Sequence, residues 1–440
     1  MSELIEAVLA DAPGERLAGL PLPERYRAAY IRKQDVGMFG DDEAEPDVRR
    51  SIHVGEVAMP ELAPDEVLVA VMASAVNFNT VWSATFRPVP TFAFLERFGR
   101  QGPRAARHDR PEQVIGSDAS GVVVRAGSAV ENWVPGDRVV VSPTYSSGQV
   151  TSGAGDGMLA DDILAWGYET NFGGMADFAV VKANQLLRKP AHLTWEESAA
   201  NMLCGMTVYR MLVSPNGARM KQGDIVLIWG AAGGLGGYAV QMVKNGGGIP
   251  VAMAGSDERA ALLREMGCEA VINRQEFMDA PGGLKSPKVL RRMGEAIRRL
   301  VGEDPHIVFE HTGQETFGAS VYLARRGGSV VTCGSSSGYQ HDYDNRYLWM
   351  KVKRIVGSHG ANMAEAHEAN RLLRLGMIVP TLSVTYPLTE AGEATRAVQL
   401  GKHVGKVGIR CLAPGDGLGV EDHELRARIG ERRLGLFRKY

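Results

Sequence analysis

The sequence predicts an α/β protein with two domains, one compact and rich in β-strands and one built on a doubly wound parallel sheet. A hydrophobic run over 225–229 leads through the turn GAAGGLG at 230–236 into an apolar, periodic stretch. This order is typical of a buried strand, a tight turn and the start of a helix. Strand and helix signals then alternate along the chain, as they do around a parallel sheet.

Composition narrows the class of protein further. The chain has 440 residues, of which 45% are hydrophobic and 23% charged, so it is long enough for two cores. A net charge of -2 gives no general attraction to nucleic acid or to an anionic membrane. The four cysteines lack metal-ligand spacing, and no signal peptide or long apolar span is present. We therefore expect a cytoplasmic protein with reduced thiols and with neither a nucleic-acid partner nor a membrane segment.

The first part of the chain predicts an arm followed by short strands. Residues 1–45 predict a partly helical and partly irregular arm, and strand signals follow at 51–57 and 66–74. Polar side chains lie between apolar ones over 76–82, where they either satisfy backbone groups or face a cleft. Further short strands and a Val-Pro-Gly-Asp turn over 116–141 indicate a compact β-rich domain.

The middle of the chain separates the two domains. A Gly/Ser-rich loop is predicted over 143–158, and the aromatic, glycine-interrupted segment ILAWGYETNFGG at 163–174 favours a pocket wall over a regular element. A helix is predicted over 196–212. We therefore assign residues 1–200 and 360–440 to the first domain, which we expect to be catalytic, and 201–359 to the parallel-sheet domain.

The glycine-rich turn is the candidate nucleotide site. Glycines let the backbone approach a pyrophosphate closely, and free amides at the helix N-terminus point at its charge. Ala231 occupies the first glycine position of the usual motif, so the interpretation depends on context. The next strand, 249–254, ends in Gly255-Ser256 with Arg259 one turn later and no carboxylate for a ribose hydroxyl. This pattern favours a 2′-phosphate and hence NADPH, the alternative being a purely structural glycine turn.

The remaining elements complete the parallel sheet. We expect a helix over 257–266, strands at 270–273, 306–310, 329–333 and 354–358, and a return to the first domain through a helix at 364–375 and strands at 382–385 and 405–411. Ligands of such sheets bind at the carboxyl ends of the strands. The candidate nucleotide-binding residues are accordingly Ala232, Gly233, Gly234, Leu235, Gly236, Ser256, Arg259, His311, Cys333 and Gly334.

This arrangement resembles the medium-chain dehydrogenase/reductase superfamily, with a GroES-like domain followed by a Rossmann domain. The resemblance places Thr207 where the superfamily contacts the nicotinamide. In its zinc alcohol dehydrogenases a cysteine lies near 77–82 and Gly-His-Glu lies at 116–121. This chain has neither the cysteine nor the histidine, so a tetrahedral catalytic zinc lacks its ligands there. The resemblance is therefore to the zinc-free reductases.

Longer stretches are similar to crotonyl-CoA carboxylase/reductase and its relatives. They are NFNTVWSATFRPVPTFAFLERFGR, IGSDASGVVVRAG, AWGYETNFGGMADFAVVKANQLL, VFEHTGQETFGASV and DYDNRYLWMKVKRIVGSH, and the similarity runs from about Tyr26 to the C-terminus. The resemblance implies that a 2-enoyl-CoA is reduced by NADPH while CO2 is added at the α-carbon, in a homo-oligomer (a dimer or tetramer). The chain has no biotin-type Met-Lys-Met and no Walker loop, so such a reaction uses dissolved CO2 directly.

The resemblance also implies a catalytic CO2 pocket formed by Asn79, Tyr168, Glu169 and His359. Asn79 and His359 donate to the oxygens of CO2, Glu169 orients the amide or a water, and Tyr168, which is usually Phe in the family, excludes solvent. Considered one at a time, each residue also has a purely structural interpretation: Asn79 as a turn cap, Glu169 as a surface carboxylate and His359 as a satisfied core histidine. Four expected residue types in three separate segments favour the pocket.

Substrate contacts are predicted on both the acyl and the CoA side. Gly360 stands where the family commonly has Phe, which vacates on the order of 100 Å³ and predicts longer or bulkier 2-enoyl-CoAs, unless Met363 or Met175 fills the space. Basic residues for the CoA phosphates come from two sets, Arg346, Lys351 and Arg354, or Lys285, Lys288, Arg291 and Arg292.

Two other functions are compatible with the sequence. In a plain enoyl-thioester reductase the same enolate is protonated and no CO2 is added. A quinone-reductase-like nucleotide-binding protein shares the nucleotide domain but does not need the set of Tyr168, Glu169 and His359.

Overall fold

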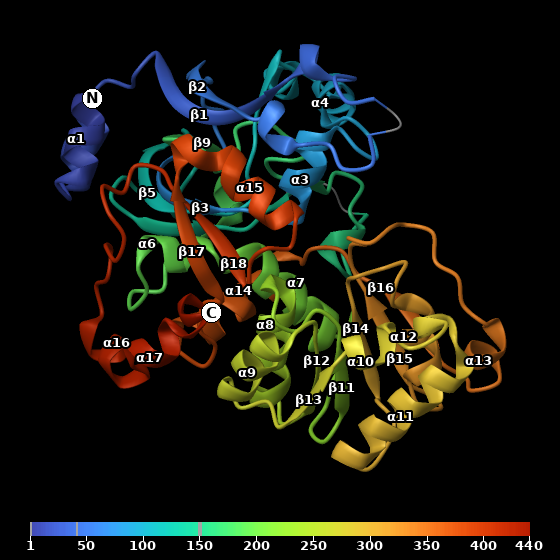
Figure 1. Ribbon diagram of the computed structural model, residues 1–440. Helices are drawn as coiled ribbons and strands as arrows, with labels where there is room; N and C mark the ends of the chain where they lie inside the picture. The colour runs from blue at the N-terminus through green and yellow to red at the C-terminus, as the bar shows by residue number, and fades with distance from the viewer. Residues whose placement is uncertain (1, 41–42, 148–151) are drawn as a thin grey trace. The chain divides into compact units, whose positions relative to one another are not determined.

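A parallel sheet with the strand order β13-β12-β11-β14-β15-β16 organises the second half of the chain (Figure 1). The computed structural model describes residues 2–40, 43–147 and 152–440. Every neighbouring pair in this sheet is parallel. The strands are β11 (Ile225–Ile228), β12 (Ile249–Ala254), β13 (Ala270–Asn273), β14 (Ile307–Glu310), β15 (Ser329–Thr332) and β16 (Arg354–Gly357). The doubly wound parallel sheet is therefore confirmed.

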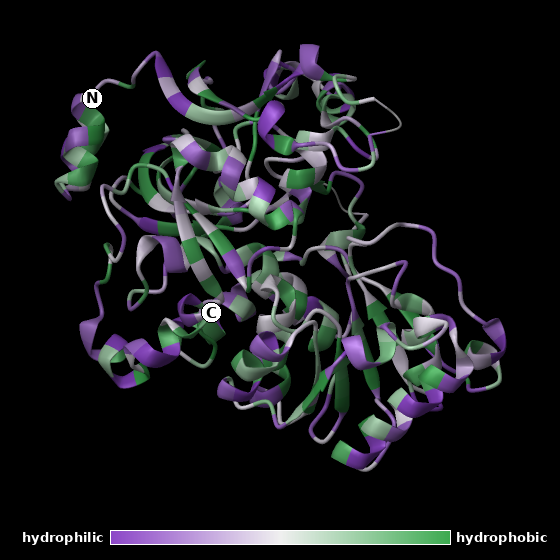
Figure 2. Cartoon of the chain, viewed as in Figure 1, coloured by the Kyte–Doolittle hydropathy of each residue, from purple (hydrophilic) through white to green (hydrophobic). Residues whose placement is uncertain are grey.

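Helices cover both faces of this sheet, with α8 and α9 on one side and α11 and α12 on the other (Figure 1). Ile225 and Leu227 of β11, and Trp229 directly after it, are buried in one cluster with residues of α11 and α12. The strands are therefore hydrophobic almost throughout, as Figure 2 shows, because both faces are covered. The helices are α7 (Met202–Leu212), α8 (Gly234–Asn245), α9 (Asp257–Glu265), α10 (Gln275–Met278), α11 (Pro287–Val301), α12 (Phe317–Leu323) and α13 (Asn345–Trp349).

The first half of the chain is built on a mixed sheet with the order β10-β6-β5-β3-β18-β17, with β9 also paired to β3. Every residue of β3 is buried, since β5, β9 and β18 all pair with it. The strands are β3 (Glu66–Ala75), β5 (Ala119–Ala126), β6 (Arg138–Val141), β9 (Phe178–Lys182), β10 (Leu186–Arg188), β17 (Leu382–Pro387) and β18 (Lys406–Arg410). This is the expected β-rich domain.

Smaller elements complete this part. A second sheet joins β1 (Arg25–Arg32) to β2 (His53–Ala58) and β4 (Glu112–Val114), and β7 (Thr144–Tyr145) pairs with β8 (Leu164–Ala165). The helices are α1 (Glu3–Leu9), α2 (Gly14–Gly19), α3 (Phe78–Thr85), α4 (Thr91–Gly99), α5 (Pro103–Ala106), α6 (Trp195–Ala199), α14 (Met363–Arg374), α15 (Ala391–Gln399), α16 (His423–Ile429) and α17 (Glu431–Leu434).

Two local predictions need correction. The arm over 1–45 contains β1, whose partners lie on other segments and leave no local signature. The single helix over 196–212 is two helices, and the amide of Asn201 donates to the carbonyls of Glu197 and Ser198 at the break. Within the predicted loop 143–158, residues 148–151 lie outside the described residues.

The chain divides into two compact units. Unit 1 comprises Met1–Leu203, Asn362–Gly376 and Leu382–Leu434, and unit 2 comprises Cys204–Ala361, Met377–Thr381 and Gly435–Tyr440. The prediction placed all of 360–440 in the first domain, which is wrong for the last two segments of unit 2. Phe437 and Thr381 pack so closely on α8 that a Cβ on Gly237 would lie 2.8 Å from each, and Lys439 pairs with Glu265 at 2.7 Å.

A buried ion pair joins distant segments of unit 1. Lys406 is 3% exposed and Asp118 is fully buried, with Nζ and Oδ2 3.0 Å apart. Nζ also donates to the Asn77 side chain and the Val76 carbonyl, while Asn77 Nδ2 donates to Asp118. The other oxygen of Asp118 accepts from Leu203 N–H at 2.9 Å. The network thus fixes the start of β18, the end of β3 and the first turns of α3 and α7.

We predict that Lys406→Met lowers the free energy of unfolding by about 3–5 kcal/mol, because it leaves the Asp118 carboxylate buried without its counter-charge. Urea denaturation followed by tryptophan fluorescence measures the change. The matched control is Lys33→Met, whose exposed pair with Glu96 at 2.7 Å contributes about 0–1 kcal/mol. Equal destabilisation by the two substitutions would contradict the prediction.

Candidate active site

Asn79 lies in the first turn of α3 with half of its amide engaged. Its Nδ2 donates to Ser117 Oγ at 2.8 Å, whereas its Oδ1 is buried with no hydrogen-bond partner among the described residues. The Ser117 hydroxyl can donate or accept, so it pairs equally well with the amide turned by 180°. In either orientation one polar end of Asn79 remains able to bind a small polar ligand.

Glu169 holds the turn in which it lies. Its Oε2 accepts from Ala165 N–H at 2.8 Å, and its own N–H donates to the Ala165 carbonyl at 2.7 Å. The carboxylate therefore fixes the backbone of residues 165–169, directly after β8. Its hydrogen bond is to Ala165, whereas the sequence analysis expected it to orient the Asn79 amide or a water.

Tyr168 contributes an aromatic wall in unit 1. The centre of its ring lies 5.8 Å from that of Phe94 on α4 and 6.4 Å from that of Trp82 on α3. Trp82 follows Asn79 by three residues, so the two side chains lie on the same face of α3. Unit 1 thus brings Tyr168, on the turn that Glu169 holds, next to the face of α3 that carries Asn79.

The turn that carries Tyr168 and Glu169 needs glycines, because its backbone packs directly against the backbone at Gly116. Gly167 has a φ of +71°, and a Cβ there would lie 2.0 Å from the Gly116 carbonyl oxygen. A Cβ on Gly173 would lie 2.6 Å from the same oxygen, and Gly174 N–H donates to it at 2.9 Å. The glycine-interrupted segment is therefore irregular because it packs directly on the strand that leads to Ser117.

His359 and Gly360 belong to unit 2, in the segment after β16, where the His359 side chain is exposed. Gly360 has a φ of +49°, a left-handed conformation that other residues adopt only with strain. Met175, one of the two residues considered for filling the space beside Gly360, is buried in the core of unit 1.

The glycine-rich turn in unit 2 has the form that a pyrophosphate needs. Gly233 is the N-cap of α8, and the first backbone bond of the helix runs from Gly237 N–H to Gly233 O. The N–H groups of the first turn, at Gly234, Leu235 and Gly236, are thus left without intrahelical partners. A Cβ on Gly236 would lie 2.2 Å from the Gly230 carbonyl oxygen, so close packing of helix and turn requires glycine there.

Two guanidinium groups flank the end of β12. A Cβ on Gly255 would lie 3.7 Å from Arg259 Nη1 and 3.6 Å from Arg274 Nε. Ser256 caps α9 by accepting from Arg259 N–H at 3.2 Å. Arginines bind phosphate through several parallel N–H bonds, so this group of residues fits a 2′-phosphate.

His311 follows β14 and lies against the glycine-rich turn. Its Nε2 is 2.9 Å from the Trp229 carbonyl oxygen, and burial lowers the pKa of the ring, so it is neutral at physiological pH. Cys333 and Gly334 follow β15, and burial raises the pKa of the Cys333 thiol to about 12. Thr207 lies buried on α7. His311 and Cys333 thus follow neighbouring strands at the carboxyl edge of the sheet, and the buried carboxylate of Glu310 acts on both of them.

The predicted CoA-binding residues are exposed side chains of unit 2. Arg346 on α13 pairs with Asp344, with Nη2 and Oδ2 2.7 Å apart, and this carboxylate raises the pKa of the guanidinium. Lys351 and Arg354 are exposed without an ion pair in the described part of the chain. The alternative set, Lys285, Lys288, Arg291 and Arg292, is exposed as well.

Sequence reasoning missed two residues, Ser117 beside Asn79 and Arg274 beside the end of β12. Ser117, the partner of Asn79, is distant in sequence and has no motif of its own. Arg274 had a usable signal, because it directly follows β13, at the carboxyl end next to β12.

Over the described ranges no group of three or more His, Cys, Asp or Glu side chains is placed to hold a metal ion. The same ranges contain no helix of the length and apolarity needed to span a bilayer.

Two family models match two separate stretches of the chain. Residues 63–191 match the alcohol dehydrogenase GroES-like domain, and residues 234–375 match the model described as zinc-binding dehydrogenase. With the glycine-rich turn and the parallel sheet, these matches define a medium-chain dehydrogenase/reductase.

Individual relatives identify the family within this superfamily. The chain is 52% identical to crotonyl-CoA reductase of Streptomyces collinus, covering 97% of both chains, and 34% identical to crotonyl-CoA carboxylase/reductase of Cereibacter sphaeroides, covering 90% of both. The solved structure of the 2-octenoyl-CoA carboxylase reductase CinF with NADP and 2-octenoyl-CoA is 56% identical, covers 99% of both chains and gives a TM-score of 0.96. The chain belongs to the crotonyl-CoA carboxylase/reductase family.

Proposed function

We propose that the protein catalyses the NADPH-dependent reductive carboxylation of a 2-enoyl-CoA to an alkylmalonyl-CoA. The observation that carries the proposal is the half-engaged amide of Asn79 in an aromatic region with Tyr168, in a chain that belongs to this family over almost its full length. Plain reduction needs no such polar group beside the reacting carbon. Carboxylation needs one, to hold CO2 in place.

The residues of unit 2 fit NADPH. The first-turn N–H groups of α8 would hold the pyrophosphate, and Ser256, Arg259 and Arg274 would hold the 2′-phosphate. Thr207, His311 and Cys333 would lie toward the nicotinamide. The bound cofactor supplies a hydride for Cβ of the enoyl thioester.

The residues of the CO2 pocket decide the fate of the resulting enolate. Its Cα forms a bond either to CO2, which gives the carboxylate of the product, or to a proton. Donors from Asn79 and His359 hold the oxygens of CO2, while the aromatic rings at Tyr168 and Trp82 keep water away. Glu169 acts as a positioning residue, since its carboxylate fixes the turn that carries Tyr168.

For the cofactor, we predict that the double variant Arg259→Gln/Arg274→Gln raises the KM for NADPH about a hundredfold or more. It removes two charged donors to the 2′-phosphate, and each is worth about 1.5–3 kcal/mol. Steady-state kinetics with NADPH and NADH measure the effect. The KM for NADH stays unchanged, and Arg264→Gln, an exposed arginine on the same helix, is the control. An equal rise for both cofactors would show that the arginines do not select the 2′-phosphate.

For the reaction, we predict that ¹³C-bicarbonate is incorporated into the thioester product and that Asn79→Leu and His359→Ala shift the product toward the uncarboxylated acyl-CoA. Loss of one hydrogen bond to CO2 lowers the ratio of carboxylation to protonation about tenfold. Product masses measure the ratio. Asn132→Leu and His423→Ala replace exposed residues of the same types and serve as controls. Absence of the label in the wild-type product would leave plain reduction as the activity.

For the acyl chain, we propose that Gly360 makes room for substrates longer than crotonyl-CoA. The 56% identity to the 2-octenoyl-CoA enzyme supports this specificity. We predict a higher kcat/KM for 2-octenoyl-CoA than for crotonyl-CoA, and a loss of this preference in Gly360→Phe. Because Gly360 is left-handed, Gly360→Ala controls for backbone strain without filling the space. A wild-type preference for crotonyl-CoA would contradict the proposal.

We assign the CoA phosphates to Arg346, Lys351 and Arg354.

We also propose that the protein is a cytoplasmic homo-oligomer, at least a dimer. All four cysteines are buried and free, as in reducing compartments. Strand β16 is an edge strand with unpaired backbone groups, and the exposed apolar side chains Trp349, Met350, Val352 and Ile355 lie on it or just before it. Sedimentation velocity is expected to show an oligomer that Ile355→Lys weakens and Leu159→Glu, at an exposed apolar residue of unit 1, does not. A monomeric wild type would contradict this.

A further inference from the structure

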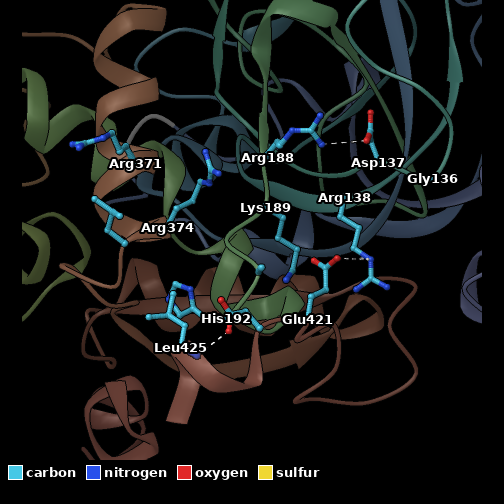
Figure 3. A pocket seen from close by; sticks show the side chains of 13 residues that line it. Gly136, Asp137, Arg138, Arg188, Lys189, His192, Arg371, Arg374, Glu421 and Leu425 are labelled. Carbon is cyan, nitrogen blue, oxygen red and sulfur yellow. Dashed lines mark hydrogen bonds and ion pairs between the residues drawn. The ribbon is translucent and has the colours of Figure 1, made fainter. Parts of the chain in front are cut away.

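Unit 1 contains a cavity of about 650 Å³ formed without any of the residues assigned above (Figure 3). Its volume lies in the range of small-molecule sites. Its charged lining consists of five cationic side chains and three carboxylates. They are Arg138, Arg188, Lys189, Arg371 and Arg374 with Asp137, Glu421 and Asp422.

The cationic side chains come from regular elements. Arg138 begins β6 and Arg188 ends β10, on neighbouring strands of the mixed sheet. Arg371 and Arg374 lie three residues apart in the last turn of α14, so they share one face of that helix. Asn370, on the same helix, donates to the Arg188 carbonyl at 3.0 Å and ties α14 to the strand. The positive charges are therefore held on a fixed framework.

The carboxylates neutralise only part of this charge. Asp137 lies 3.3 Å from Arg188, and Glu421 lies 3.6 Å from Arg138. Outside the lining, Asp11 lies 2.9 Å from Arg138 and Glu368 lies 3.9 Å from Arg371. Asp422 caps α16 by accepting from Leu425 N–H at 2.8 Å. Arg374 makes no ion pair within the described residues.

Lys189 adds a buried positive charge. It is 4% exposed, and its Nζ donates to the carbonyls of Leu193 and Gly419 at 2.5 and 2.7 Å and to that of Pro190 at 3.2 Å. These partners carry no net charge. Burial lowers the pKa of Lys189 to about 8, so the ammonium form still dominates at neutral pH, and an anion in the cavity would stabilise it.

His192 shows that the cavity has a polar group in need of a partner. Its side chain is fully buried, it lines the cavity, and neither ring nitrogen has a hydrogen-bond partner among the described residues. Leaving such a group unsatisfied is unfavourable and rare in folded proteins. Burial lowers the pKa of His192 to about 4, so the neutral ring offers one N–H donor and one acceptor.

We propose that this cavity is a binding site for a small phosphorylated molecule, separate from the reaction and its cofactor. A phosphoryl group carries between one and a half and two negative charges at neutral pH. It would meet Lys189 and Arg374, the lining cations that make no ion pair among the described residues, whereas Arg138, Arg188 and Arg371 are paired. The two arginines of α14 present parallel donors to it. The neutral ring of His192 pairs with a hydroxyl of the same ligand, since a hydroxyl both donates and accepts.

Calorimetric titration with glycerol 3-phosphate tests the site in the full-length protein, with saturating NADP⁺ and CoA present so that their phosphate-binding groups are occupied. We expect saturable binding that Arg374→Gln weakens about tenfold and Arg371→Gln/Arg374→Gln abolishes. Both arginines are exposed, so these variants should fold normally, and NADPH-dependent turnover should stay unchanged. Arg428→Gln, at an exposed arginine of α16 outside the lining, is the matched control and should bind like wild type.

Two further measurements decide between ligand classes. Inorganic phosphate is expected to bind more weakly than glycerol 3-phosphate, and His192→Phe is expected to remove that difference while keeping the ring volume. The proposal is overturned if wild type and the double arginine variant bind equally, or if neither binds. It is also overturned if the dicarboxylate succinate binds in place of the phosphates. Because turnover is measured separately, these outcomes leave the proposed carboxylation untouched.

Discussion

A single buried ammonium group ties together the part of unit 1 that carries the candidate site. Lys406 reaches Asp118 and Asn77, residues that lie hundreds of positions earlier in the chain. Asp118 adjoins Ser117, which binds Asn79, and Asn77 directly precedes the helix on which Asn79 lies. Because a buried charge is tolerated only with its partners in place, this network allows one arrangement of β18, β3 and α3.

Close backbone contact is the second constraint, and it operates in both units. In unit 1 the segment around Gly167 and Gly173 rests on the Gly116 carbonyl, which places Tyr168 and Glu169 near α3. In unit 2 Gly236 rests on the Gly230 carbonyl, which aims the first turn of α8 beyond the end of β11. Neither contact leaves room for a Cβ atom. The glycines therefore determine where functional side chains and free N–H groups lie.

The two units differ in how their sites arise. The candidate nucleotide site of unit 2 comes from successive strand–turn–helix repeats, so its residues follow strand ends in regular order. The region around Asn79 comes from segments near positions 79, 117 and 168, joined by strand pairing and by the Lys406 network. The basic cavity combines β6, β10, α14 and the segment before α16 in the same way, and no motif in the sequence marks it.

The sequence alone predicted the elements whose signals are local. Strands 249–254 and 270–273 have the predicted bounds, and the glycine-rich turn, Ser256 and Arg259 lie where the pattern indicated. Family resemblance, later confirmed by the 52% identical relative, supplied what local patterns lacked. Strand β1, the break at Asn201 and the docking of Phe437 on α8 were missed, because each depends on a partner far along the chain.

The sequence by itself determined the fold class, the position of the glycine-rich turn and the family, since hydrophobic periodicity and glycine spacing act over a few residues. Only the tertiary structure decided that Asn79 pairs with Ser117 and that Arg274 lies near Arg259 at the end of β12. It also decided that His192 lies in the wall of the cavity without a hydrogen-bond partner among the described residues. Such contacts depend on which distant segments meet. That choice is made by the packing of the whole chain, because no local pattern encodes the partner of a side chain.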